Sequence, residues 1–429
     1  MKNRISLFVV AAMLAASVLS FPQEPALEGH RYREVKHVIF MVPDGMGLAD
    51  VTAARILKNC GNTPTTQPFI FCAEGPGGPP LNFETLEHIG YQRTYSKVNT
   101  ITDSSAAAST WACGEKFVNN EVCFHADGAP NNPTLLELAK QNRWGTGLVA
   151  TQTITHATPA AFGAHLADRN CETEIARQYV EETQPDVMLG GGQATFKPSA
   201  ADVCGVSGDF ITEAQTRGYT YVTTKQAMDD AVASGVTRLL GLFASKNLTP
   251  EYQRLPTSLQ PRLPETTAAA LAILEKHPTG FFLLLEGSLI DSGNHAENVQ
   301  YQYGEMLAFD QSVKVVRDWI NASPERKEHT LLIVAPDHET GGFAVKGLPP
   351  RGGEEPGAGL GPFLTTPVQA GVEPPGGWVF TLVPTDPIDR EAHHTGGDEL
   401  IWSSGPGSEL LGRAIENTYV YWVVKQAIR

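Results

Sequence analysis

Five short apolar segments that end in glycine, proline or acidic residues constrain the fold of this chain most strongly. They are HVIFMVPDG (37–45), TGLVATQ (146–152), DVMLGGG (186–192), GFFLLLEG (280–287) and HTLLIVAPDH (329–338). Runs this short and this apolar predict strands that are buried on both faces. Segments with helical patterns lie between them, at 133–141, 172–182, 265–276 and 295–320. This alternation predicts an α/β fold, a three-layer sandwich in which helices flank a large, mainly parallel sheet.

Two segments differ in composition from this pattern. Residues 1–20 open with Lys2 and Arg4 and continue as an apolar run, which predicts a secretory signal peptide rather than a membrane anchor. We therefore expect residues 21–429 to form the mature catalytic domain, exported to the periplasm or secreted, with no membrane partner. Residues 346–377 are dense in Gly and Pro and predict an inserted, crown-like loop or subdomain.

Charge and cysteine content restrict the partners and the compartment. The formal net charge of −15 argues against nucleic acid as a partner, because a phosphate backbone would be repelled. An even number of cysteines in an exported chain favours disulfides over thiol chemistry. Several connectivities remain open, and we favour the sequence-local set Cys60–Cys72, Cys113–Cys123 and Cys171–Cys204.

Acidic residues and histidines follow three of the predicted strands. The ends of parallel strands share one edge of a sheet, where α/β proteins bind ligands. Each residue taken alone has a plain structural interpretation, such as a turn aspartate or a helix cap. Together, carboxylates and imidazoles at one edge predict a multi-metal site that suits zinc and magnesium. The residues concerned are Asp44, Glu286, Asp291, His295, Asp337, His338 and His394.

Two further segments carry polar residues that are candidates for catalysis or for ligand binding. ITDSSAAAST (101–110) holds two adjacent serines, and THATPAAFGAHLADRN (155–170) holds His156, Thr158 and Arg169. Arg169 is an ordinary surface charge in isolation, but beside a metal cluster it becomes a candidate bidentate clamp for phosphate or carboxylate.

The motifs VPDGMG, TDSSAA, HATPAAFGAHLADR, EGSLIDSGNHA, PDHETGG and HTGG occur in this order. With these motifs the chain resembles the alkaline phosphatases from about Lys36 to its C-terminus. The resemblance implies that Asp291, His295 and His394 bind a first zinc. It implies a second zinc at Asp337 and His338, bridged by Asp44 to a magnesium whose other ligands match Thr158 and Glu286.

The resemblance also assigns the catalytic groups. Ser104 matches the nucleophile, Arg169 the phosphate clamp and Asp103 the carboxylate that orients this arginine. Ser105 falls where the family usually has alanine. A phosphate monoester would then be cleaved through a phosphoserine at Ser104, and the cations and Arg169 would let an acidic protein bind an anionic substrate. Members of the family are commonly homodimers, so a homodimer is implied.

Two positions depart from one version of the family. His156 stands where some bacterial members carry aspartate, and Ser292 replaces a lysine of those members. His156 is itself a candidate residue of the third metal site, and it leaves that cation open between magnesium and zinc. Two rival functions also stay open: a phosphodiesterase or sulfatase-like relative, and a non-catalytic exported protein that binds zinc or phosphate.

Overall fold

The computed structural model describes residues 34–428 apart from 67–68, 70–71, 73–74, 76, 130, 199–202, 346–377 and 380–391. The predicted signal peptide and the Gly/Pro-rich insertion lie outside the described residues.

A ten-stranded sheet with the order β14-β2-β13-β8-β1-β7-β3-β4-β6-β5 runs through the described chain. Its strands pair in parallel except β13, which runs antiparallel to β2 and β8. The strands are β1 (His37–Val42), β2 (His88–Arg93), β3 (Gly145–Thr153), β4 (Val187–Gly191), β5 (Thr220–Val222), β6 (Leu239–Leu242), β7 (Phe281–Glu286), β8 (Thr330–Val334), β13 (Glu399–Ser404) and β14 (Ala414–Glu416). Two small ribbons pair β9 (Glu339–Thr340) with β12 (His394–Thr395) and β10 (Ala344–Val345) with β11 (Trp378–Val379).

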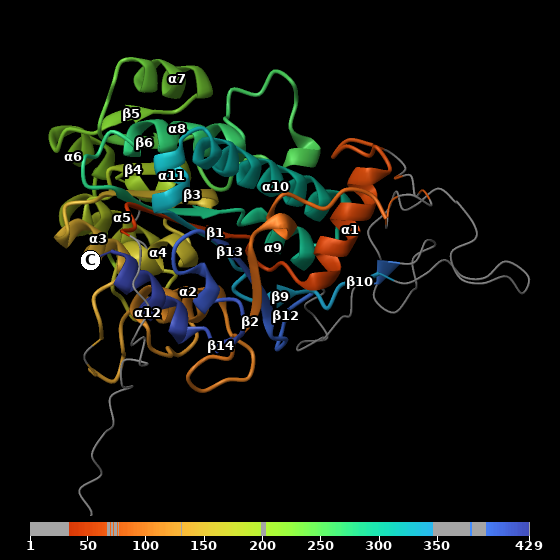
Figure 1. Cartoon of the computed structure of the whole chain (residues 1–429). Helices are drawn as coiled ribbons and strands as arrows, with labels where there is room; N and C mark the ends of the chain where they lie inside the picture. Colours follow the sequence, from red (N-terminus) through yellow and green to blue (C-terminus); the bar gives the residue numbers. More distant parts are fainter. Residues whose placement is uncertain are drawn as a thin grey trace, which may run out of the picture. The chain divides into compact units, whose positions relative to one another are not determined.

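Helices cover both faces of the sheet (Figure 1). On one side, α8 (Leu263–Leu274) and α10 (Val299–Asn321) pack together, and α1 (Leu48–Asn59) contacts α10. On the other side, α2 (Ser104–Cys113) packs on α4 (Ala157–Gly163) and α12 (Thr418–Ala427), with α3 (Leu135–Gln141) beside α4. The other α-helices of the described residues are α5 (Glu172–Gln178), α6 (Phe210–Thr216), α7 (Lys225–Ala233), α9 (Leu289–His295) and α11 (Pro324–His329). The predicted three-layer α/β fold is confirmed.

The central strands are apolar because both of their faces are covered. The six residues of β7 are all buried, and β1 is buried from Val38 to Val42. At about 25 cal/mol per Å² of apolar surface removed from water, these strands supply much of the driving force for folding. The sheet is therefore a rigid platform for the groups that leave its carboxyl edge.

The five predicted strands are confirmed as β1, β3, β4, β7 and β8. The predicted helix at 295–320 is wrong at its start, because α9 ends at His295 and α10 begins at Val299. Glu297 adopts a left-handed φ of 49°, and the Asn298 side chain accepts a hydrogen bond from the Tyr301 amide to begin the second helix. The helix expected at 172–182 is α5 followed by a π-helical turn at Tyr179–Thr183.

The three predicted disulfides are present: Cys60–Cys72, Cys113–Cys123 and Cys171–Cys204. Of the helices in the described ranges, none combines the length and the apolar character that crossing a bilayer requires.

Candidate active site

The candidate site lies where three central strands end. β1 pairs in parallel with both β7 and β8, and Val42 at its end aligns with Glu286 at the end of β7. Asp44 follows the end of β1 and Asp337 follows the end of β8, so both lie at the same carboxyl edge of the sheet as Glu286. All three carboxylates are fully buried. The topology therefore gathers acidic groups from distant parts of the sequence in one interior position.

A first group of possible metal ligands consists of Asp291, His295 and His394. Asp291 and His295 lie one turn apart on α9, and His394 comes from β12. His295 Nε2 lies 3.3 Å from Asp291 Oδ2 and 3.2 Å from His394 Nε2. The Nδ1 atoms of the two rings face the backbone carbonyls of Ala392 and Thr102. A ring that donates from Nδ1 keeps a lone pair on Nε2, which is the form that a metal ligand needs.

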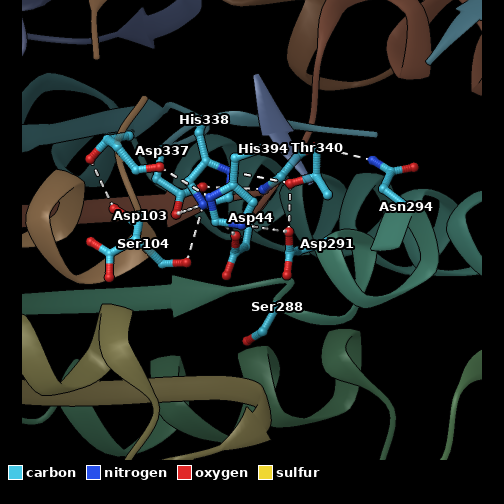
Figure 2. Close-up of polar contacts among 12 residues, drawn as sticks. Asp44, Asp103, Ser104, Ser288, Asp291, Asn294, Asp337, His338, Thr340 and His394 are labelled. Carbon is cyan, nitrogen blue, oxygen red and sulfur yellow. Dashed lines mark hydrogen bonds and ion pairs between the residues drawn. The ribbon is translucent and has the colours of Figure 1, made fainter. Parts of the chain in front are cut away.

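A second group forms around His338. Its Nε2 lies 3.2 Å from Asp337 Oδ2 and 3.7 Å from Asp44 Oδ1. In Figure 2 the side chains of Asp44, Asp291, His338 and His394 gather at the centre of the cluster. Ligand atoms of Asp44, Asp291 and His338 lie within 4.8 Å of one another, as a shared cation requires. Burial, together with the neighbouring His394, lowers the pKa of His338 well below its ordinary value, so the ring is neutral.

A third group lies on the other side of Asp44. Ligand atoms of Asp44, His156 and Glu286 lie within 4.8 Å of one another, and the buried hydroxyl of Thr158 adjoins Glu286. His156 is the residue that precedes α4, and its Nε2 lies 2.9 Å from Arg169 Nη2. Burial and the charge of Arg169 lower the pKa of His156 to about 3.

The electrostatics of this cluster favour bound cations. Burial, reinforced by the charges of neighbouring carboxylates, raises the pKa of Asp44 well above its usual range and that of Asp337 to about 7. Burial likewise raises the pKa of Glu286 to about 7. Both carboxylate oxygens of Asp44 and of Glu286, Oδ2 of Asp337 and Oγ1 of Thr158 are buried without a well-formed hydrogen bond. Their polar neighbours, such as Thr158 beside Glu286 and His338 beside Asp337, do not meet them in hydrogen-bonding geometry. Buried oxygens without partners are costly, and cations at these three groups would satisfy them.

Asp291 differs from the other carboxylates. Burial opposes its ionisation, but the adjacent imidazoles of His295 and His394 hold its pKa below the ordinary value. The low pKa favours the ionised form of this carboxylate.

Ser104 is the first residue of α2, and its hydroxyl is aimed at the metal groups. Asp103 caps this helix by accepting a hydrogen bond at 2.9 Å from the amide of Ala106. Ser104 is 2% exposed, and its Oγ lies 3.2 Å from His338 Nε2. The helix N-terminus adds a positive potential that favours an anion at this point.

Arg169, in the loop after α4, lies beside Asp103 and His156. Its Nη1 donates to Asp103 Oδ2 at 3.1 Å, while its Nη2 faces His156. Asp103 Oδ2 also accepts hydrogen bonds from the Ser105 hydroxyl at 2.8 Å and the Asn120 amide at 3.0 Å. The guanidinium is therefore held between one carboxylate and one imidazole at the edge of the cluster.

The structure thus gathers into one cluster the residues that the sequence singled out. Sequence reasoning missed Thr340, whose hydroxyl contacts both Asp291 and His338. It also missed the carbonyls of Thr102 and Ala392 that orient two of the histidines. The motif DHETGG contains Thr340, but nothing in its spacing indicates a contact with Asp291.

Comparison with known proteins identifies the family of this chain. Residues 35–360 match the family described as alkaline phosphatase. Alkaline phosphatase 3 of Bacillus subtilis is 33% identical to this chain, over 80% of the chain and 70% of that protein. The streptomycin-6-phosphate phosphatase of Streptomyces griseus is 31% identical, over 97% of the chain and 96% of that protein.

Solved structures agree. The alkaline phosphatase of the Antarctic bacterium TAB5 is 26% identical, with a TM-score of 0.72 over 93% of this chain and 99% of that one. Variants of the TAB5 enzyme, in which one histidine is replaced by glutamate or aspartate, have magnesium bound in a site called M3. The chain belongs to the alkaline phosphatase family, whose members hydrolyse phosphate monoesters.

Proposed function

We propose that this enzyme hydrolyses phosphate monoesters through a phosphoserine formed on Ser104, with two zinc ions and one magnesium ion. The observation that carries the proposal is the position of the Ser104 hydroxyl, 3.2 Å from His338 Nε2 and beside a buried cluster of unsatisfied carboxylates. A free serine hydroxyl is a weak nucleophile at neutral pH and needs activation by a base or a cation.

The donor atoms suggest how the cations are distributed. Two groups combine imidazole nitrogen with carboxylate oxygen, which suits zinc. The first comprises Asp291, His295 and His394, and the second comprises Asp44, Asp337 and His338. When bound, zinc lowers the pKa of oxygen nucleophiles and stabilises negative charge on the attacking and leaving oxygens of a phosphoryl transfer.

The protein's own groups position the substrate. Arg169 offers a planar fork of donors, which suits the free oxygens of a terminal phosphoryl group. Asp103 holds one arm of that fork, and the α2 N-terminus faces the same anion. Phosphoryl transfer depends mostly on positioning and charge neutralisation, so these contacts contribute directly to the rate. A phosphodiester lacks one of the free oxygens, and we therefore favour monoesters as substrates.

The third cation is proposed to be magnesium. A guanidinium only donates hydrogen bonds, so His156 accepts from Arg169 at Nε2 and carries its proton on Nδ1. A protonated nitrogen cannot ligate a metal, which leaves Asp44, Thr158 and Glu286 as an all-oxygen set that suits magnesium. Zinc at this position would require His156 to release Arg169.

We also propose that the mature protein is exported and works as a homodimer. Three disulfides support export, because such bonds persist in oxidising compartments. The dimer rests on family membership alone.

The test compares hydrolysis of p-nitrophenyl phosphate and of its bis-ester at alkaline pH, with and without a chelator, for the wild type and Ser104→Ala. We expect preference for the monoester, loss of activity with the chelator, and loss of turnover in Ser104→Ala. Preference for the bis-ester would contradict monoesterase activity, and activity that resists the chelator would contradict the metal mechanism.

A further inference from the structure

One buried hydroxyl connects two of the candidate metal groups. Thr340 is fully buried in β9, two residues after His338, and pairs across the ribbon with His394 of β12. Its Oγ1 lies 2.6 Å from Asp291 Oδ1 and 3.2 Å from His338 Nδ1. Figure 2 shows Thr340 beside the histidines and above Asp291, with its hydroxyl facing both.

The chemistry of a hydroxyl fixes the direction of both hydrogen bonds. It has one hydrogen and two lone pairs, while an ionised carboxylate only accepts. Thr340 therefore donates to Asp291 and accepts from His338, so Nδ1 of His338 carries the ring proton. His338 Nε2, which faces Ser104 at 3.2 Å, then keeps its lone pair.

His338 differs in this respect from the other two histidines. His295 and His394 direct Nδ1 to backbone carbonyls, which no substitution of a side chain removes. His338 directs Nδ1 to a side chain, so its orientation depends on the residue at position 340.

The backbone of Thr340 is fixed to the same site. Its amide donates to the carbonyl of Gly45 at 3.1 Å, and the Gly45 amide donates to Asp337 Oδ1 at 3.1 Å. The turn that carries Asp44 is thus tied to β9, and the hydroxyl of Thr340 has a defined position relative to both groups.

We propose that Thr340 is a positioning residue that couples the two zinc centres: its single hydroxyl holds Asp291 of one and His338 of the other in the form that binds metal. The inference rests on the proposed function, because it takes the two groups to be zinc sites. It assigns Thr340 no contact with the substrate.

The test measures zinc affinity directly, by competition with a chromogenic chelator, in the full-length protein stripped of metal. Thr340→Val keeps the shape of the side chain and removes the hydroxyl, while Thr340→Ser keeps the hydroxyl. Thr395→Val is the matched control. Thr395 follows His394 in β12, on the opposite strand of the same ribbon, and its hydroxyl contacts Glu339 rather than a candidate metal ligand. Circular dichroism of the metal-free proteins checks folding, and Thr340→Ala replaces the valine variant if that variant fails to fold.

Loss of an outer hydrogen-bond partner typically weakens metal binding by about 10- to 100-fold. We expect this loss of zinc affinity for both zinc equivalents in Thr340→Val. Thr340→Ser and Thr395→Val should bind zinc with nearly the wild-type affinity. Unchanged zinc binding in Thr340→Val, weakening of one equivalent alone, or equal loss in Thr340→Ser would each overturn the coupling. Wild-type protein that binds no zinc would instead overturn the proposed function on which the inference rests.

Discussion

Asp103 performs two tasks through its two carboxylate oxygens, and Asp103→Asn separates them. Oδ1 accepts the Ala106 amide and caps α2, a task that an asparagine oxygen also performs. Oδ2 accepts hydrogen bonds from the Ser105 hydroxyl, the Asn120 amide and Arg169 Nη1. An amide nitrogen at this position cannot accept, so in the variant Arg169 loses its anionic partner while the helix cap remains.

The expected magnitude follows from the exposure of the pair. A hydrogen bond to a charged group contributes about 1.5–3 kcal/mol. The side chains of Arg169 and Asp103 are 16% and 15% exposed, so solvent screens the pair in part and the lower figure applies. If that contribution supports phosphate binding, Asp103→Asn weakens phosphate affinity about tenfold. Turnover persists, because Ser104 and the metal ligands are unchanged.

The assay is competitive inhibition by inorganic phosphate, measured together with kcat. Ser105→Ala serves as the control, because it removes one hydrogen bond to Oδ2 and leaves the charge of Asp103 in place. Asp103→Ala additionally loses the cap and should be less stable than Asp103→Asn by about 1 kcal/mol in urea unfolding. An unchanged phosphate inhibition constant in Asp103→Asn would refute the view that Asp103 anchors the clamp.

Three further predictions concern other parts of the molecule. Ser105→Ala should be nearly as active as the wild type in p-nitrophenyl phosphate turnover, and inactivity would mean that the nucleophile is Ser105. His156→Asp should bind magnesium more tightly, because it adds an oxygen near Asp44 and Glu286; an unchanged magnesium dependence of turnover would count against this. Burial and the charge of Glu251 raise the pKa of Glu305 to about 8 in the folded protein. Because the folded state then holds a proton that the unfolded state has lost, Glu305 reduces stability as pH rises from its ordinary pKa toward 8. Glu305→Gln should remove a slope of up to about 1.4 kcal/mol per pH unit from urea unfolding, and equal slopes in both proteins would contradict it.

The fold could be predicted where local patterns coincide with burial on both faces. The continuous apolar run at 280–287 predicts a strand, and β7 occupies Phe281–Glu286. The break between α9 and α10 could not be predicted, because helical periodicity gives no sign of the left-handed φ at Glu297. The antiparallel direction of β13 also depends on its partners β2 and β8 rather than on its own residues.

The candidate site could be predicted in part because its ligands follow strand ends and carry distinctive side chains. Asp44, Glu286 and Asp337 meet for a topological reason, the parallel pairing of β1 with β7 and β8. Thr340 could not be assigned in the same way. Its contact with Asp291 exists only because β9 and α9, which are far apart in the chain, meet in the fold. A threonine in a glycine-rich turn carries no chemical signature of that contact.

The central claim is that Ser104 carries the phosphoryl group during turnover. Metal-loaded enzyme should be incubated with a phosphate monoester, quenched in acid, digested and analysed by peptide mass spectrometry. We predict one phosphoryl group on Ser104 in the wild type, and none on the corresponding peptide of Ser104→Ala. Phosphate on Ser105 or elsewhere, or turnover by Ser104→Ala at the wild-type rate, would contradict the account.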